Sequence, residues 1–591
     1  MVAILLARTR SMWGHKVKLW RLLRENVLGC QWSYHKRCFS SSVWDRVRAH
    51  RGNGSLIIEN FRHMKNGAVG YDTLQENVEI FSRNLAFHID AKQSSSTMRK
   101  TKIAFLCKPS ITYIVSLLSI WKLNAVAVPL SPSHPYSEVE HVLNDSGADI
   151  VLYEDDLKAL LDTTDALNLD DNLSFNCSLG HPSLVDKVAK RNCSYDDLGK
   201  EDAYIVYTSG TTGKPKGVVH THGAIETQIK DIVEAWGYKK SDHILHFLPL
   251  HHLHGIVNKL LCILYVGGTI EFIEANPEVL WKRLISNTDA TLFMAVPTIY
   301  ARMIEVYRYQ MTREEQKAIR ESFKTPPMRL MVSGSAALPV HILDSWKEIT
   351  THTLLERYGM SEFCMGLTNP LSPSEKRFPG YVGKPFRSID VVLCNPEKPD
   401  EHDIIDITEC DEHGVSATGE IRIKTDGMFS RYLNLSVKTK ESFDPKGYFK
   451  TGDIACFNST LDSYKILGRN NVDIIKFKGY KISALEIERV LQEDPCVLES
   501  CVFGVEDIAA YGDGSEVIVA LLRVATTSSD DIANIEQNLR TLLSSRLAHY
   551  KNPKLYFFVS EIPKNAMGKV NKKQIKTDYK KGAFQKIAKR P

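Results

Sequence analysis

The feature that most constrains the fold is the stretch at residues 207–217, which reads YTSGTTGKPKG. An apolar, β-rich run precedes it at residues 203–207 and another resumes at Val218, so a sheet would present the stretch as a loop between strands. Its glycines let the backbone approach an anion, and its hydroxyl and lysine side chains can donate to one. The residues concerned are Thr208, Ser209, Gly210, Thr211, Thr212, Gly213, Lys214 and Lys216. The sequence therefore predicts a polyphosphate-binding loop, with a spacing that differs from GxxxxGK[ST].

Length and composition indicate a multidomain globular protein. A chain of 591 residues exceeds what one hydrophobic core usually organises, so at least two domains are expected. No apolar run approaches the roughly 18 residues of a membrane span, so none is expected. The 12 cysteines show no CxxC pair or metal-ligand spacing, which favours a reducing compartment over a disulfide framework.

Positive charge is concentrated at the N-terminus. The formal net charge is +5, and residues 1–44 hold eight Lys or Arg and one acid, so the rest of the chain is slightly negative. An acid-poor leader with interleaved Leu, Val and Trp is typical of a mitochondrial transit peptide. We expect residues 1–39 to be that peptide, with cleavage near Phe39 and a location in the matrix. The alternative is a basic arm that contacts nucleic acid or a membrane surface; the transit peptide is favoured, and no nucleic-acid partner is expected.

Alternating apolar strands and helices predict an α/β fold class. The polar residues 163–200 indicate a surface excursion. A joint is expected within residues 468–481, so a large domain at 45–470 precedes a small domain at 471–591. The Lys-rich tail at 572–589 is expected to be a solvated end. The expected strands include 102–107, 125–130, 501–505 and 516–524, and the expected helices include 111–123, 484–491 and 532–547.

Further blocks follow the loop in order. A small-residue turn after an apolar strand suits a close approach of backbone to a ligand. The turn comprises Gly334, Ser335 and Ala336, and the next block is Tyr358, Gly359, Met360, Ser361 and Glu362. With residues 448–453 (YFKTGD), Arg469 and residues 563–570 (PKNAMGKV), the set resembles the adenylate-forming superfamily of acyl-CoA synthetases, luciferases and adenylation domains. The resemblance covers about residues 100–575.

The resemblance implies a large N-terminal α/β domain with layered sheets, a small mobile C-terminal α/β domain, and an ATP site. In that site the loop and the small-residue turn surround the nucleotide, Tyr358 stacks on adenine, and Ser361 faces the α-phosphate. Gly359 and Met360 lie beside the nucleotide, and Asp453 and Arg469 contact the ribose. Glu362 would bind Mg²⁺, which prefers carboxylate and phosphate oxygens. Lys569 would stabilise the charge that develops on the α-phosphate in the transition state.

Two half-reactions are implied. A carboxylic acid and ATP give an acyl-adenylate and pyrophosphate, and the CoA thiolate then displaces AMP. Between the steps the small domain rotates, which withdraws Lys569 and brings Gly479 and Tyr480 toward the pantetheine. Four residues rather than the usual three lead from Arg469 to the next Asp, so the hinge falls at Asn471 or Val472 and the choice stays open.

The acid substrate is harder to infer. Residues 247–255, 294–302, and 329–339 with 354–361 look like those of the malonyl-CoA synthetases within this superfamily, where the extra hinge residue also occurs. A dicarboxylate must keep its second carboxylate charged inside a pocket, which requires a cation or several donors. Arg302 can bind a carboxylate bidentately, and His254 and Ser335 can add donors. The alternative for Arg302 is a solvent-facing helix position.

We therefore expect an ATP-dependent ligase that converts malonate to malonyl-CoA, with methylmalonate as an open second substrate. A short- or medium-chain fatty acyl-CoA synthetase is the alternative enzyme, and its pocket would lack the cation. A catalytically inactive nucleotide-binding protein is the alternative of another class, and the presence of Lys569, Glu362 and Asp453 argues against it. The expected partners are small molecules only (malonate, ATP and CoA), and a monomer is expected although the oligomeric state stays open.

Overall fold

The computed structural model describes residues 43–60, 67–92, 100–162, 174–176, 199–208, 215–286, 289–324, 327–470, 472–477, 480–506, 516–525, 529–564 and 570–584. The predicted transit peptide at 1–39 and most of the predicted surface excursion at 163–200 lie outside these residues. Among the described helices, none has both the length and the apolar character needed to cross a bilayer.

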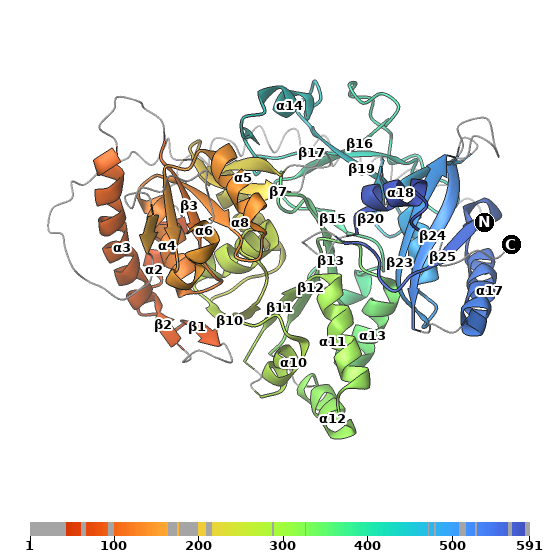
Figure 1. Ribbon diagram of the computed structural model, residues 1–591, viewed down its shortest axis with the longest axis horizontal. Helices are drawn as coiled ribbons and strands as arrows, with labels where there is room; N and C mark the ends of the chain where they lie inside the picture. The colour runs from red at the N-terminus through yellow and green to blue at the C-terminus, as the bar shows by residue number, and fades with distance from the viewer. Residues whose placement is uncertain are drawn as a thin grey trace, which may run out of the picture.

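Two large sheets organise the first part of the chain (Figure 1). The first has nine strands in the order β15-β14-β13-β12-β11-β9-β10-β1-β2, and the second has seven in the order β18-β8-β7-β4-β3-β5-β6. The nine strands are β1 (Leu56–Asn60), β2 (Gly67–Gly70), β9 (His243–His246), β10 (Thr269–Ile273), β11 (Leu292–Ala295), β12 (Leu330–Ser333), β13 (Leu355–Tyr358), β14 (Leu367–Thr368) and β15 (Lys384–Pro385). The seven are β3 (Lys102–Leu106), β4 (Val126–Leu130), β5 (Ile150–Tyr153), β6 (Ser174–Asn176), β7 (Asp202–Thr208), β8 (Lys216–Thr221) and β18 (Arg431–Tyr432).

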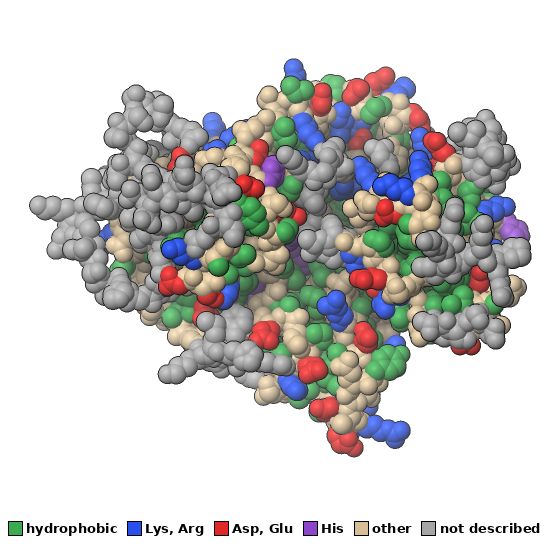
Figure 2. Space-filling view, in the orientation of Figure 1, with side chains coloured by type: hydrophobic (Ala, Val, Ile, Leu, Met, Phe, Trp, Pro, Cys, Tyr) green, Lys and Arg blue, Asp and Glu red, His purple; other side chains and the backbone are tan. Residues whose placement is uncertain are grey.

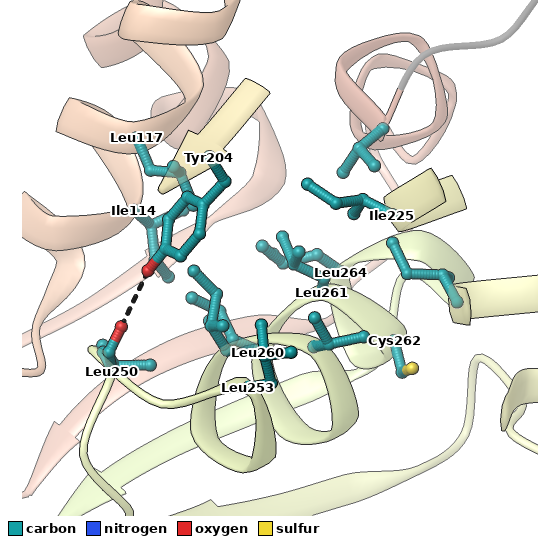
Figure 3. Close-up of a cluster of buried hydrophobic side chains, with 14 of the residues drawn as sticks. Ile114, Leu117, Tyr204, Ile225, Leu250, Leu253, Leu260, Leu261, Cys262 and Leu264 are labelled. Atoms are coloured by element: carbon teal, nitrogen blue, oxygen red, sulfur yellow. Dashed lines mark hydrogen bonds between the residues drawn. The ribbon is translucent and has the colours of Figure 1, made fainter. Parts of the chain in front are cut away.

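Apolar side chains on alternate strand positions build separate cores on the two faces of each sheet. In β3, Ile103 and Phe105 enter the central core, whereas Ala104 and Leu106 enter the core on the other face. The central core lies between the two sheets, and helices that connect the strands of each sheet contribute side chains to it (Figure 3). There Tyr204 reaches across to the backbone of Leu250, to which its hydroxyl donates over 3.0 Å.

Helices cover the sheets, and several begin at residues suited to capping. Ser110 and Thr221 accept backbone N–H groups at the starts of α4 and α8, and Thr312 forms a reciprocal capping box with Glu315 at α12. The helices of this part are α2 (Val43–Ala49), α3 (Tyr71–Lys92), α4 (Ile111–Lys122), α5 (Tyr136–Ser146), α6 (Ala159–Asp162), α8 (His222–Ala235), η3 (His254–Leu261), α9 (Cys262–Val266), α10 (Pro277–Ser286), α11 (Pro297–Tyr309), α12 (Arg313–Ser322), α13 (Val340–Thr350) and α14 (Ser436–Glu441). Short 3₁₀ turns are η2 (Asp155–Leu157), η4 (Ser374–Lys376) and η5 (His549–Lys551).

Smaller sheets follow toward the C-terminus, where the last elements gather at one end of the molecule (Figure 1, blue). A three-stranded sheet there packs on α15 and α17 with one face and on α18 with the other. The strands are β16 (Asp390–Cys394), β17 (Gly419–Lys424), β19 (Phe449–Asn458) and β20 (Ser463–Arg469) in one sheet, β21 (Ile474–Phe477) and β22 (Tyr480–Ser483) in a hairpin, and β23 (Val497–Glu506), β24 (Glu516–Val524) and β25 (Leu555–Phe558) in the last. The helices are α15 (Ala484–Leu491), α17 (Ser529–Arg546) and α18 (Lys572–Lys580).

The predicted strands and helices are confirmed. The prediction of a solvated tail at 572–589 is wrong at its first residue. Lys572 opens α18 and is only 8% exposed. Its ammonium lies 2.7 Å from a carboxylate oxygen of Asp473 and 2.7 Å from one of Glu488. Two acids that are distant in sequence therefore bury a lysine that composition alone places in solvent.

Candidate active site

Four neighbouring parallel strands of the nine-stranded sheet end at one edge. In the order β13-β12-β11-β9, they lead directly into Gly359, Gly334, Val296 and Phe247. Ligands of open α/β sheets bind outside the carboxyl ends of the strands, because loops there can converge on them. The blocks singled out in the sequence thus meet at the edge where a ligand is expected.

The predicted phosphate loop connects two antiparallel strands. Thr208, half-buried at the end of β7, pairs with Lys216 at the start of β8. Its inner residues, 209–214, lie outside the described residues, and they include Ser209, Gly210, Thr211, Thr212, Gly213 and Lys214. The position of a loop between strands is confirmed.

Lys216 and Glu362 face each other at the base of this loop. The Lys216 ammonium lies 3.4 Å from Glu362 Oε1 and 3.7 Å from the centre of the Tyr432 ring, whose hydroxyl donates to the same Oε1 over 2.7 Å. Burial lowers the pKa of Lys216, while Glu362 opposes that shift. Glu362 is 4% exposed, and the neighbouring Ser361 is held through its carbonyl by His220 Nε2 at 2.8 Å. A cation and a buried carboxylate therefore stand together where the polyphosphate loop begins.

A second polar group joins β13, β19 and β20. The Tyr358 hydroxyl donates to Asp453 Oδ2 over 2.6 Å, and Arg469 Nε lies 3.4 Å from Asp453 Oδ1. Burial raises the pKa of Asp453, and Arg469 and Tyr358 oppose the shift. The sequence named these three residues from separate blocks, and the structure brings them together.

The small-residue turn follows β12. A side chain at Gly334 would place its Cβ 2.3 Å from Arg357 Nε, and one at Gly359 would meet the Cys364 carbonyl at 1.9 Å, so only glycine fits either place. Ser335 adopts a φ of +70°, which is uncommon for a residue with a side chain. Ala336 and Ser335 are exposed and Met360 is half-buried, so the turn opens to solvent over a buried floor.

The floor under Ser335 consists of His254 and Arg357. Arg357 Nη2 donates to Ser335 Oγ over 3.2 Å, and His254 Nδ1 lies 3.4 Å from the same oxygen. Arg357 and His254 are both 6% exposed. Burial lowers the pKa of Arg357 to about 10, and burial together with Arg357 and Lys259 lowers the pKa of His254 well below its usual value. The basic side chains of Arg357 and His254 therefore both contact the hydroxyl of Ser335 at the edge of the sheet.

Arg302, the cation chosen from the sequence, is exposed on α11. Arg357 was not predicted as a site residue, although its place in β13 directly before the predicted residue Tyr358 could have identified it. In a strand, successive side chains point to opposite faces, and sequence alone did not say which face Arg357 would take.

Several buried donors around this floor have no hydrogen-bond partner among the described residues. They are His254 Nε2, Arg357 Nε, Asn258 Nδ2 and Ser333 Oγ. Buried polar groups are nearly always paired, so an unpaired set at the carboxyl edge of a sheet points to a missing acceptor. An anion with several oxygens fits this set.

Besides the six loop residues, four of the predicted residues cannot be placed with their side chains. Lys569, Asn471 and Gly479 lie outside the described residues, and Tyr480 is described only as the first residue of β22. Val472 is half-buried, and its N–H donates to the Arg469 carbonyl over 3.1 Å.

Cys394, His402 and Asp444 form a group of metal-ligand type away from this edge, with their ligand atoms within 4.8 Å of one another. Arg422 Nη1 lies 3.2 Å from Asp444 Oδ2, which His402 also contacts at 2.7 Å. A guanidinium on the carboxylate opposes a second cation there, so the group is better explained as a structural ion network.

Basic side chains gather on the molecular face between the four-stranded sheet and the C-terminal elements (Figure 2). A local excess of positive charge attracts polyanionic ligands and speeds their association.

Comparison with known proteins places the chain in a family. A model described as AMP-binding enzyme matches residues 49–433, and one described as AMP-binding enzyme C-terminal domain matches residues 486–569. The chain therefore belongs to the AMP-binding enzymes.

Named relatives and a solved structure agree with this. The chain is 39% identical over 490 residues to the mitochondrial malonate–CoA ligase ACSF3 of Xenopus laevis, covering 80% of this chain and 82% of the relative. It is 38% identical over 503 residues to the malonate–CoA ligase of Arabidopsis thaliana, covering 81% and 78%. ATP-bound MatB from Rhodopseudomonas palustris has a TM-score of 0.73 at 24% identity, covering 91% of this chain and 99% of that one. The predicted adenylate-forming fold is confirmed.

Proposed function

We propose that this chain is an AMP-forming malonate–CoA ligase. The observation that carries the proposal is the set of buried, unpaired donors around Ser335, which adjoins the ATP-contact residues and suits a substrate with a second carboxylate. The two malonate–CoA ligases at 38% and 39% identity support the same acid. Methylmalonate has the same two carboxylates and is proposed as a second substrate.

The reaction proceeds in two steps. One carboxylate oxygen of malonate attacks the α-phosphorus of ATP, the bond to the β-phosphate oxygen breaks, and pyrophosphate leaves. The CoA thiolate then attacks the acyl carbon, a C–S bond forms, and AMP leaves with the electrons of the broken C–O bond. The second carboxylate stays intact and requires a cationic partner and further donors; Arg357 supplies the cation, His254 and Ser335 supply donors, and Arg302 is the alternative cation.

Charge on the nucleotide is met by residues from several elements. Lys216 and the loop at 209–214 would contact the phosphates, Tyr358 the adenine, and Asp453 with Arg469 the ribose. Lys569 would reach the α-phosphate during the first step. The buried carboxylate of Glu362 fits Mg²⁺, because it stands beside Lys216 at the base of the phosphate loop and carboxylate oxygens are ligands that this ion prefers. Bound Mg²⁺ would neutralise the phosphates.

The domain movement and the compartment are proposals of the same kind. A large domain at 45–470 and a small one at 471–591 would rotate about Asn471 or Val472, and Gly479 and Tyr480 would then face CoA. Residues 1–39 are proposed to direct the chain to the mitochondrial matrix, and the name of the Xenopus relative describes that protein as mitochondrial. We propose a monomer.

Pyrophosphate release tests the proposal. The full chain without residues 1–39 is assayed with ATP, Mg²⁺ and CoA against acetate, malonate, methylmalonate, succinate and octanoate. Malonate is expected to give the highest kcat/KM. Preference for octanoate or acetate would instead assign a short- or medium-chain fatty acyl-CoA synthetase, and no release with any acid would favour an inactive nucleotide-binding protein.

A further inference from the structure

Lys259 is a fully buried lysine beside the proposed acid site. Its side chain is 0% exposed, and its ammonium donates to the Met294 carbonyl at the end of β11 over 3.1 Å. The ammonium also lies 3.9 Å from the centre of the Phe247 ring, directly after β9. Lys259 thus reaches the same carboxyl edge of the sheet at which Ser335 and Arg357 stand.

The helix that carries Lys259 has two distinct sides. It is a π-helix, whose i→i+5 pattern brings Lys259 one turn along from His254, and such turns are rare and frequent at functional sites. Leu253, Leu260 and Leu261 pack into the central core (Figure 3). His254 and Lys259 instead contact Ser335 and the end of β11. The polar side of η3 therefore faces the strand ends.

No acid balances this lysine. Among the described residues, none offers a carboxylate within ion-pair distance of Lys259, and the titratable groups that it influences, His246 and His254, are bases. Arg357 adds a third base to the same group. Burial without an opposite charge disfavours the ammonium form, so the pKa of Lys259 lies well below its usual value. An anionic substrate beside it would favour the protonated form.

We propose that Lys259 is a specificity-determining residue, whose amino group takes up a proton when an acid with a second carboxylate binds and so favours such acids. This inference rests on the proposed function, because it concerns the acid of the same site. Arg357 and His254 hold the carboxylate near Ser335, and protonated Lys259 supplies positive charge from the neighbouring strand end. Monocarboxylic acids bring no second carboxylate to stabilise that proton, so they gain nothing from Lys259.

Lys259→Met tests the proposal, because methionine keeps the length and removes the charge. The wild-type chain, Lys259→Met and the exposed control Lys240→Met are compared by pyrophosphate release with malonate and with propionate. For Lys259→Met, kcat/KM for malonate is expected to fall about 10- to 100-fold, mainly through KM, while propionate turnover is unchanged or rises. Lys240→Met should match the wild type. An unchanged ratio of malonate to propionate in Lys259→Met would overturn the proposal.

Thermal stability separates this role from a structural one. Without substrate, Lys259→Met is expected to have a Tm equal to or above that of the wild type, and malonate should raise its Tm less than it raises the wild-type Tm. A lower Tm together with an undiminished malonate-induced rise would assign Lys259 to the fold and overturn the proposal. Lys259→Leu repeats both measurements if the methionine variant does not fold. The proposed function fails separately, if the wild type itself does not turn over malonate.

Discussion

The nucleotide end and the acid end of the site handle charge in opposite ways. At the nucleotide end, Lys216 contacts Glu362 and Arg469 lies near Asp453, so each cation has an acid beside it. At the acid end, Arg357, His254 and Lys259 have no acid within ion-pair distance among the described residues. The difference teaches that the proposed nucleotide end balances its charges within the chain, whereas the proposed acid end would be balanced only by a negatively charged substrate.

Replacing Arg357, the basic residue at the centre of the group that has no acidic partner among the described residues, should have the largest effect on activity. Arg357→Met is expected to lower kcat/KM for malonate about 100- to 1,000-fold, because the substrate carboxylate would lose its buried cation. Propionate turnover should fall far less. Pyrophosphate release measures both.

Arg302→Met is the matched comparison for that experiment. The structure leaves Arg302 exposed, so a small loss is expected. A selective loss of malonate turnover in Arg302→Met, with Arg357→Met nearly normal, would move the carboxylate contact to α11.

At the paired end, Asp453→Asn should raise KM for ATP about 10- to 100-fold, since the amide accepts from Tyr358 less well and no longer attracts Arg469. KM for malonate should change by no more than about twofold, because distant sites without shared partners behave independently. Initial rates with each substrate varied in turn distinguish the two constants. Equal changes in both would show that the two ends are not independent.

Stability should also differ between the ends. Lys216→Met leaves Glu362 buried with Tyr432 as its remaining donor, so the free energy of unfolding is expected to fall by about 3 kcal/mol. Arg357→Met should not destabilise the fold, because it removes an unpaired charge. Urea unfolding at pH 7 measures both variants, and similar losses in the two would contradict the contrast.

The smallest effect concerns Glu356, which adjoins Arg357 but belongs to neither end. Burial raises the pKa of Glu356 to about 7, and a backbone N–H from Gly380 opposes the shift. The folded state therefore holds a proton that the unfolded chain releases near its ordinary pKa of about 4.3, so stability declines as pH rises toward 7. Glu356→Gln does not titrate and should be more stable than the wild type by about 2 kcal/mol at pH 8, with no gain at pH 4.5. Urea midpoints against pH measure this, with the exposed Glu348→Gln as control; a gain that does not depend on pH would contradict the assignment.

Local sequence predicted the elements well where it carried strong patterns. The helix expected at 484–491 and the strand expected at 516–524 have those bounds as α15 and β24. Gly334 was expected where the backbone closely approaches a ligand, and atoms of Arg357 occupy the space that a side chain there would need. Steric requirements of this kind act over a few residues, so sequence can report them.

Burial of charge was predicted less well. Lys572 was assigned to solvent, and Lys259 attracted no notice within an apolar run. Arg302 was predicted because an arginine can bind a carboxylate bidentately, and Arg357 was not, because its burial depends on which face of β13 it takes. Each of these outcomes depends on partners that lie far away in sequence.

The sequence by itself determined the adenylate-forming fold and the order of its blocks, and it predicted the residues that are proposed to serve ATP, because glycine turns, strand alternation and short motifs are local properties. Only the tertiary structure decided which bases share the acid site. The reason is electrostatic: the energy of a charged side chain depends on its burial and on the charges around it, and both are set by strands and helices that meet only after folding.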